Sequence, residues 1–172
     1  MHREGLPLRL EVQKTGLWSG RKHQFEFPRY EGRVEFDPAD PARARVELVV
    51  TAGEFRLLDT WVSEKDRGKI KSFTRSREML DVERYPAIAF RSTSIEPLGG
   101  ERYRVRGQLE IRGVSKPIQF EAHAKRENTG FLVEGRSLFR MSEFGLKPPS
   151  AALGLIGTKD EVSLEFRIRV RP

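Results

Sequence analysis

The side chains that could do acid–base, nucleophilic or metal chemistry are few in this chain, and they stand far apart. It contains three histidines, His2, His23 and His123, and no cysteine. No two histidines share the spacing of a metal site, and no carboxylate clusters with a histidine in the sequence. A nucleophile without a neighbouring base is not activated. We therefore predict a protein that is not an enzyme, with no catalytic residue, no metal ligand and no cofactor.

The other polar residues that could attract attention have plainer structural explanations. Ser115 in the run GVSK and Ser142 in MSEFG are typical of turns, and the glycine pair at 99–100 is typical of a bend. The acidic pair at 160–161 opens an alternating run, which predicts a solvated strand edge. His123 stands between apolar residues of the opposite parity, so we expect it to face solvent.

Alternation of apolar and polar residues dominates the chain and indicates the elements that position these side chains. Residues 103–124 alternate on both sides of the turn GVSKP, and the run at 160–170 alternates throughout. Strict period two is typical of strands with one dry and one wet face. One helix is expected after Ser63, which can cap it, with apolar residues Ile70, Phe73 and Leu80 at mostly helical spacing. Short strands at regular intervals predict an all-β fold, an antiparallel barrel of about eight strands with one or two short helices.

Length and charge limit the classes of protein further. The chain has 172 residues, enough for one domain over residues 1–172, and a formal net charge of +7. Its arginines alternate with apolar residues and mix with glutamates, while the aromatic residues share the dry face. Nucleic-acid-binding sheets place aromatics on the wet face, so we expect no nucleic-acid partner. Transient contact with an anionic membrane surface stays open.

Location in the cell is expected from the same sequence. No apolar run approaches the length of a membrane-spanning helix, and the first twelve residues do not resemble a secretory signal. We therefore expect a cytoplasmic protein, or a periplasmic one if a leader was removed.

The inward residues of the predicted barrel mix large and small side chains. The small ones, Gly107, Ala122, Ala124, Gly135 and Ser137, gather on adjacent segments and predict free space on that side. A barrel of this size is either filled by its own side chains or holds one small ligand. The pattern alone leaves both interpretations open: a core packed by phenylalanines, or a lumen for an oily molecule.

Four segments, taken in order, resemble the YceI-like family. The hairpin QLEIRGVSKPIQFEAHA is similar to the hallmark hairpin of that family, and VEFDPADPARARVELVVTAGEF, MLDVERYPAIAFRSTSIE and MSEFGLKPPSAALGLIGTKDEVSLEFRI resemble its other characteristic segments. The resemblance covers the chain from about Thr15 to Val170. It implies an extended lipocalin-like barrel whose lumen takes a long apolar chain, typically a polyisoprenoid quinone or a prenyl lipid, and it is compatible with a homodimer.

The resulting functional prediction is a carrier or storage protein for a long-chain isoprenoid or fatty lipid. The alternative is a non-catalytic interaction or stress-related barrel with a filled core and a basic surface for an acidic partner or a membrane. The residues predicted to line the lumen lie on the inward face, on the helix or in the loop at 144–157: His23, Phe25, Phe27, Phe36, Leu48, Val50, Ile70, Phe73, Leu80, Phe90, Leu109, Phe120, Val133, Phe139, Phe144, Leu146, Leu155 and Phe166.

Two of these features carry specific expectations. The loop FGLKPPSAALGLIG at 144–157 is too apolar for a freely solvated loop, so we expect it to fold over one barrel end with the helix and act as a gate. His23 shares a face with Phe25 and Phe27 and can donate an N–H to a ligand head group. The alternative is that His23 bonds a neighbouring backbone carbonyl at the barrel rim.

Overall fold

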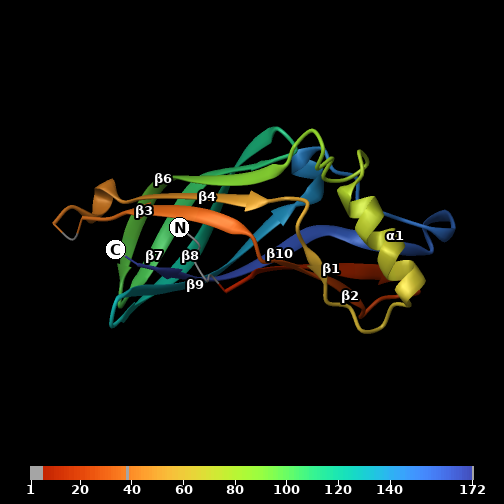
Figure 1. Ribbon diagram of the computed structural model, residues 1–172, viewed down its shortest axis with the longest axis horizontal. Coiled ribbons are helices and arrows are strands. Elements are labelled where there is room, and N and C mark those ends of the chain that lie inside the picture. The colour runs from red at the N-terminus through yellow and green to blue at the C-terminus, as the bar shows by residue number, and fades with distance from the viewer. Residues whose placement is uncertain (1–5, 38, 172) are drawn as a thin grey trace.

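A computed structural model describes residues 6–37 and 39–171 of the chain (Figure 1). The described residues form ten strands, one α-helix and three short 3₁₀ helices, so the predicted all-β class is confirmed, with more strands than expected. The strands are β1 (Leu8–Gly16), β2 (Lys22–Phe27), β3 (Tyr30–Glu35), β4 (Arg45–Thr51), β5 (Arg56–Leu57), β6 (Ala87–Gly99), β7 (Arg102–Ile111), β8 (Val114–Glu127), β9 (Gly130–Arg140) and β10 (Ile156–Val170). The helices are α1 (Glu64–Arg75), η1 (Pro41–Arg43), η2 (Met141–Phe144) and η3 (Ala152–Gly154).

The strands form a single antiparallel sheet that curls into a half-barrel. Its order is β3-β4-β6-β7-β8-β9-β10-β1-β2-β5, so β3 and β5 are its two edges. Only Pro28 and Arg29 separate β2 from β3. The chain passes there from β2, which lies next to the edge strand β5, to β3 at the opposite edge of the sheet. Proline lacks the N–H that a ladder needs, so Pro28 ends β2. The break at Pro28 is expected from the sequence, whereas the two-residue β5 is a strand that no alternating run predicts.

The predicted alternation is confirmed along the hallmark hairpin. In β7 the side chains of Val105, Leu109 and Ile111 are buried, whereas Arg106 and Glu110 between them are exposed. His123 on β8 is exposed, as expected, and His2 lies outside the described residues.

The outer face carries cross-strand ion pairs, so the arginines there are matched by glutamates. Arg102 approaches Glu121 at 2.8 Å, and Arg167 approaches Glu134 at 2.7 Å. Each such exposed pair contributes little to stability, but the pairs keep this face soluble and in register. This arrangement is the solvated charged face that the sequence predicts.

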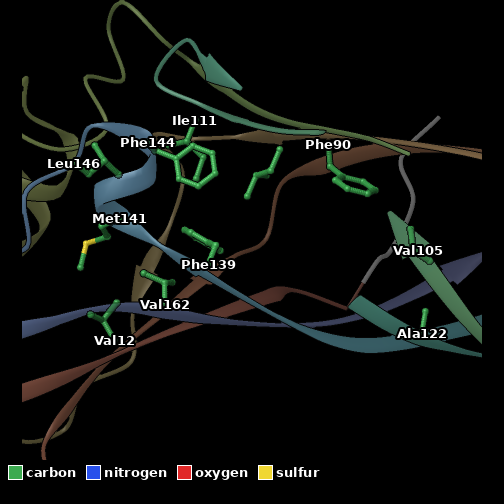
Figure 2. Close-up of a cluster of buried hydrophobic side chains, with 11 residues drawn as sticks. Val12, Phe90, Val105, Ile111, Ala122, Phe139, Met141, Phe144, Leu146 and Val162 are labelled. Atoms are coloured by element: carbon green, nitrogen blue, oxygen red, sulfur yellow. The ribbon is translucent and has the colours of Figure 1, made fainter. Parts of the chain in front are cut away.

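Two apolar clusters cover much of the inner face, and Figure 2 shows one of them. In the cluster that Figure 2 draws, Met141, Phe144 and Leu146 lie together around η2, and Phe90, Val105 and Ala122 lie apart from them on the sheet. The second cluster is built around Leu8, Phe25, Phe27, Val50, Phe55 and Leu57.

The expectation that the small inward residues leave free space is wrong for both glycines. A Cβ added at Gly107 would lie 2.5 Å from the ring of Phe90, and one at Gly135 would lie 2.3 Å from the ring of Phe166. Each glycine therefore accommodates the ring of a phenylalanine from the neighbouring strand. A ring that packs over a glycine in this way also stabilises the glycine within the sheet.

The predicted helix is confirmed as α1. Ser63 precedes it, and the Ser63 hydroxyl oxygen accepts a hydrogen bond from the Asp66 N–H at 3.1 Å. Ile70 and Phe73 are half-buried, while Leu80 lies beyond the end of the helix in a turn. Since α1 has no fully buried residue, it covers the sheet with a partly solvated face. In Figure 1 the helix lies across one end of the barrel beside β1 and β2.

Candidate functional site

A cavity of about 920 Å³ lies between α1 and the inner face of the sheet. Its walls come from β1, β2 and β10, from α1, and from the segment that follows η2. The volume falls in the range of small-molecule sites, which are about 300–1,000 Å³. Most of the residues that line the cavity are apolar.

The structure brings eight of the predicted lining residues together around this cavity. They come from β2, from α1 and the turn after it, and from the end of β9 with the following loop: His23, Phe25, Phe27, Ile70, Phe73, Leu80, Phe139 and Leu146.

Most of the other predicted residues belong to the two apolar clusters and lie away from the cavity walls. The buried ones are Val50, Phe90, Leu109 and Phe144, and the partly buried ones packed against them are Leu48, Phe120, Val133 and Phe166. Phe120 illustrates the reason, because its ring packs against those of Phe90 and Phe166 at centroid distances of 5.6 and 5.2 Å. These aromatic contacts cover the inner face outside the cavity walls, where Phe120 and Phe166 are half-buried.

The expectation that Phe36 and Leu155 line the lumen is wrong. Phe36 follows the last residue of β3, where strand parity no longer holds, and its side chain is 42% exposed and packs against Phe131. Leu155 precedes β10 and is 59% exposed at the surface.

The loop at 144–157 divides into a wall and an exposed tip. Leu146, Pro149, Ala151 and Ile156 line the cavity, so the loop does reach one barrel end as expected. Leu153 at its tip is fully exposed. A gating movement of this loop stays a prediction.

His23 lies in the cavity wall and forms a hydrogen-bonded pair with Asp59. Its Nδ1 lies 2.6 Å from the Asp59 Oδ2, and the other carboxylate oxygen accepts the Gln24 N–H at 2.8 Å. The Asp59 side chain is completely buried. Because an ionised carboxylate only accepts hydrogen bonds, the proton between the two groups is on Nδ1, and Nε2 is the ring nitrogen that Asp59 does not engage. The partner of His23 is thus a carboxylate, which neither sequence interpretation included.

Two tryptophans complete the wall around His23. The Trp61 ring stacks on His23 at 5.2 Å and meets Trp18 edge-on at 5.4 Å. Trp61 is fixed because its Nε1–H donates to the Lys22 carbonyl at 3.0 Å. Sequence reasoning missed Asp59 and both tryptophans because they lie in loops, where no periodicity assigns a direction.

Helix α1 is tied to the edge of the sheet by Arg67. Its guanidinium donates to the carbonyl of Leu57 at 2.5 Å and to the carbonyl of Asp59. This contact holds the helix over the same loop that supplies Asp59 and Trp61. It therefore couples the cavity cover to the His23 pair.

Lys14 is a second polar residue in the wall that sequence reasoning missed. Its parity with Leu8, Leu10 and Val12 places it on the inner face of β1, and this signal was available in the sequence. The side chain is buried, its Nζ donates to the Thr158 Oγ1 at 3.1 Å, and Nζ lies 5.9 Å from the Trp18 ring centroid. Burial lowers the pKa of Lys14 from its usual value near 10.5.

The two serines considered for catalysis make structural hydrogen bonds. Ser142 donates its hydroxyl to Asp160, which also accepts the Ser142 N–H at 2.8 Å. Ser115 donates to the Gln108 side chain at 3.3 Å.

Among residues 6–37 and 39–171, no group of three His, Cys, Asp or Glu residues is arranged to hold a metal ion. Nor does any helix in that part of the chain have the length and hydropathy to cross a membrane.

Residues 8–170 match the model of the YceI-like domain family. A UPF0312 protein of Pseudomonas putida is 27% identical over 133 residues, which make up 73% of this chain and 64% of that protein. A UPF0312 protein of Shewanella denitrificans is 29% identical over 129 residues, or 70% and 62% of the two chains. The matched region thus spans less than two thirds of the length of these relatives.

Solved structures share the fold. Burkholderia cenocepacia BcnA superposes with a TM-score of 0.76 at 19% identity, covering 95% of this chain and 96% of that one. A Campylobacter jejuni YCEI protein superposes with a TM-score of 0.69 at 17% identity, covering 86% and 84% of the two chains.

Proposed function

Because the chain belongs to the YceI-like family, whose model it matches over residues 8–170, we propose that it binds one long apolar chain in its barrel lumen. The ligand is a polyisoprenoid, an isoprenoid quinone or a similar single-chain lipid, and the protein carries or stores it. The observation that supports this most is the cavity of about 920 Å³ beneath α1, with apolar walls from the helix and the sheet.

The hairpin of β1 and β2 gives the ligand a direction. Across the ladder its inner face pairs Leu8 with Phe27, then Leu10 with Phe25, then Val12 with His23. The side chains thus change from apolar to polar toward the turn at 16–20. The tail of a bound chain lies against the phenylalanines, and its head lies near His23.

Burial of the tail supplies enough free energy for such a complex. Each buried carbon contributes about 0.8 kcal/mol, so one five-carbon prenyl unit contributes about 4 kcal/mol. Association costs about 4–15 kcal/mol in lost motion. A few prenyl units therefore offset the cost, and the polar groups at the mouth decide which head group is accepted.

Apolar side chains at the mouth suit the transfer of such a ligand from a membrane. Leu17 and Trp18 in the β1–β2 turn and Leu153 and Leu155 in the neighbouring loop are exposed. The Leu17 N–H donates to the Leu155 carbonyl at 2.9 Å, so the two segments adjoin. Together with the net positive charge, this rim supports a transient contact with an anionic bilayer during loading.

Mass spectrometry of the purified protein tests the proposal. Native spectra should show a mass beyond that of the chain, and organic extraction should release one class of long-chain lipid at close to one molecule per protein. Protein that carries no chain and takes none up from a lipid mixture would favour the alternative of a filled barrel that acts through its surface.

A further inference from the structure

The least expected group in the cavity wall is a buried ammonium. Lys14 is 8% exposed although it lies in a predominantly apolar wall. A lysine that is desolvated to this extent is normally paired with a carboxylate. Among residues 6–37 and 39–171, Lys14 makes no ion pair, and Thr158 is its one side-chain hydrogen-bond acceptor. An ammonium has three N–H donors, so two are left for other acceptors.

The surroundings of Lys14 carry an excess of positive charge. The cavity wall includes Lys14, Arg21 and Lys69 as cations and one carboxylate, Asp66, which lies 3.7 Å from the Lys69 ammonium. A second carboxylate, that of Asp59, lies behind the wall and is bonded to His23. Burial also lowers the pKa of Lys14, because desolvation disfavours the ammonium, and a bound anion would offset that cost.

Lys14 lies one step nearer to the mouth than His23 on the same face of the hairpin. Val12 pairs with His23, and the Lys14 N–H donates to the Arg21 carbonyl at 2.8 Å in the next rung. A chain whose tail reaches Phe25 and Phe27 therefore has its first atoms beside Lys14 and Thr158.

We propose that Lys14 and Thr158 form an anion subsite, and that the cavity prefers a single-chain lipid with an anionic head over its neutral counterpart. This inference rests on the proposed function, to which it adds the class of head group. A carboxylate or a phosphate monoester supplies acceptors for the two remaining N–H groups, and Thr158 positions the ammonium toward it. A fatty acid and a prenyl monophosphate share this chemistry.

Calorimetric titration of delipidated protein with matched pairs of chains tests the subsite. One pair is palmitate and methyl palmitate, and the other is geranylgeranyl monophosphate and geranylgeraniol. Charge-assisted hydrogen bonds in a desolvated site predict that each anion binds on the order of tenfold more tightly than its neutral partner. The pair with the larger ratio identifies which anion the subsite fits.

The variant Lys14→Met removes the charge while keeping an unbranched side chain, so it relieves a desolvation cost and should fold. It is expected to lose the preference for anions, so that the ratio of the two affinities in each pair falls toward one. Lys65→Met, on the exposed face of α1 outside the cavity, makes the same change in net charge and should keep the preference.

Three outcomes would overturn the inference. If the wild-type protein binds charged and neutral chains equally, Lys14 does not contact the ligand head group. The anion subsite is then disproved, and the lipid-binding proposal is unaffected. If Lys14→Met and Lys65→Met lose the preference equally, the preference for anionic chains comes from the net charge of the protein alone. If none of the chains binds, the lipid-binding proposal fails together with the subsite.

Discussion

Replacing Asp59 with asparagine should move the proton of His23 from one ring nitrogen to the other. In the wild type the buried carboxylate accepts from His23 Nδ1 at 2.6 Å and from the Gln24 N–H at 2.8 Å. Asparagine has the same shape, and its oxygen can keep the bond to Gln24. Its amide nitrogen then faces Nδ1 as a donor, so Nδ1 must become the acceptor and Nε2 must carry the proton.

The same change should lower stability by a measurable amount. Two hydrogen bonds to a charged acceptor contribute about 1.5–3 kcal/mol each, whereas neutral ones contribute about 0.5–1.5 kcal/mol. The Asp59 side chain is fully buried, so solvent does not reduce the difference. Asp59→Asn should therefore cost about 1–3 kcal/mol, which corresponds to a fall in Tm of about 2–12 °C for a chain of this size. Asp59→Ala, which leaves both donors without a partner, should cost more.

Nitrogen-15 NMR of the imidazoles reads the proton position directly. The chain has only three histidines, and the exposed His123 serves as the internal control. We expect the wild-type His23 to show a protonated Nδ1 and a bare Nε2, with the two signals exchanged in Asp59→Asn. An unchanged proton position in the variant, or a wild-type Nδ1 without a proton, would refute this description of the pair.

Three further predictions concern the cover, the core and the buried lysine. Arg67→Ala removes the donors to the carbonyls of Leu57 and Asp59, so it should cost about 1–3 kcal/mol and speed amide hydrogen exchange in α1; unchanged exchange would contradict the anchoring role. Gly135→Ala should lower the free energy of unfolding in urea by about 1–3 kcal/mol, because the added Cβ would lie 2.3 Å from the Phe166 ring. Gly68→Ala in α1 adds a Cβ with nothing within 4 Å, so it should raise that free energy by about 0.5–1 kcal/mol. Equal effects of the two changes would disprove the packing argument. Burial lowers the pKa of Lys14, so the unfolded chain binds more protons than the folded one between that lowered pKa and 10.5. The free energy of unfolding of the wild type, relative to that of Lys14→Met, should therefore rise with pH through this window. A difference that does not change with pH would show that Lys14 is solvated.

Period-two alternation predicted the architecture because it reports directly which face of a strand is dry. It placed Val105, Leu109 and Ile111 inward on β7 without error, and Ser63 was sufficient to locate the start of α1. The same rule failed for Phe36, which lies one residue past β3, because parity has no meaning outside a strand.

The boundary between core and cavity could not be predicted from the sequence. Phe27 and Phe166 are both inward on their strands, yet Phe27 borders the cavity and Phe166 fills the space above Gly135. That difference depends on which residues of neighbouring strands meet, and register between distant strands is not encoded in any single segment. Asp59 and Trp61 were missed for a related reason, since their directions are set by contacts with His23 and Lys22 across the fold.

A titration of delipidated protein with geranylgeraniol, followed by tryptophan fluorescence, tests the central claim most directly. Both tryptophans, Trp18 and Trp61, lie in the cavity wall and should report occupancy. Thr74→Phe places a large side chain in the cavity, whereas Ser72→Phe adds the same ring on an exposed position of α1 outside it. We predict saturation at one chain per protein for the wild type and for Ser72→Phe, and at least tenfold weaker binding for Thr74→Phe. Absence of binding to the wild type, or equal binding by both variants, would contradict the claim that the lumen holds the ligand.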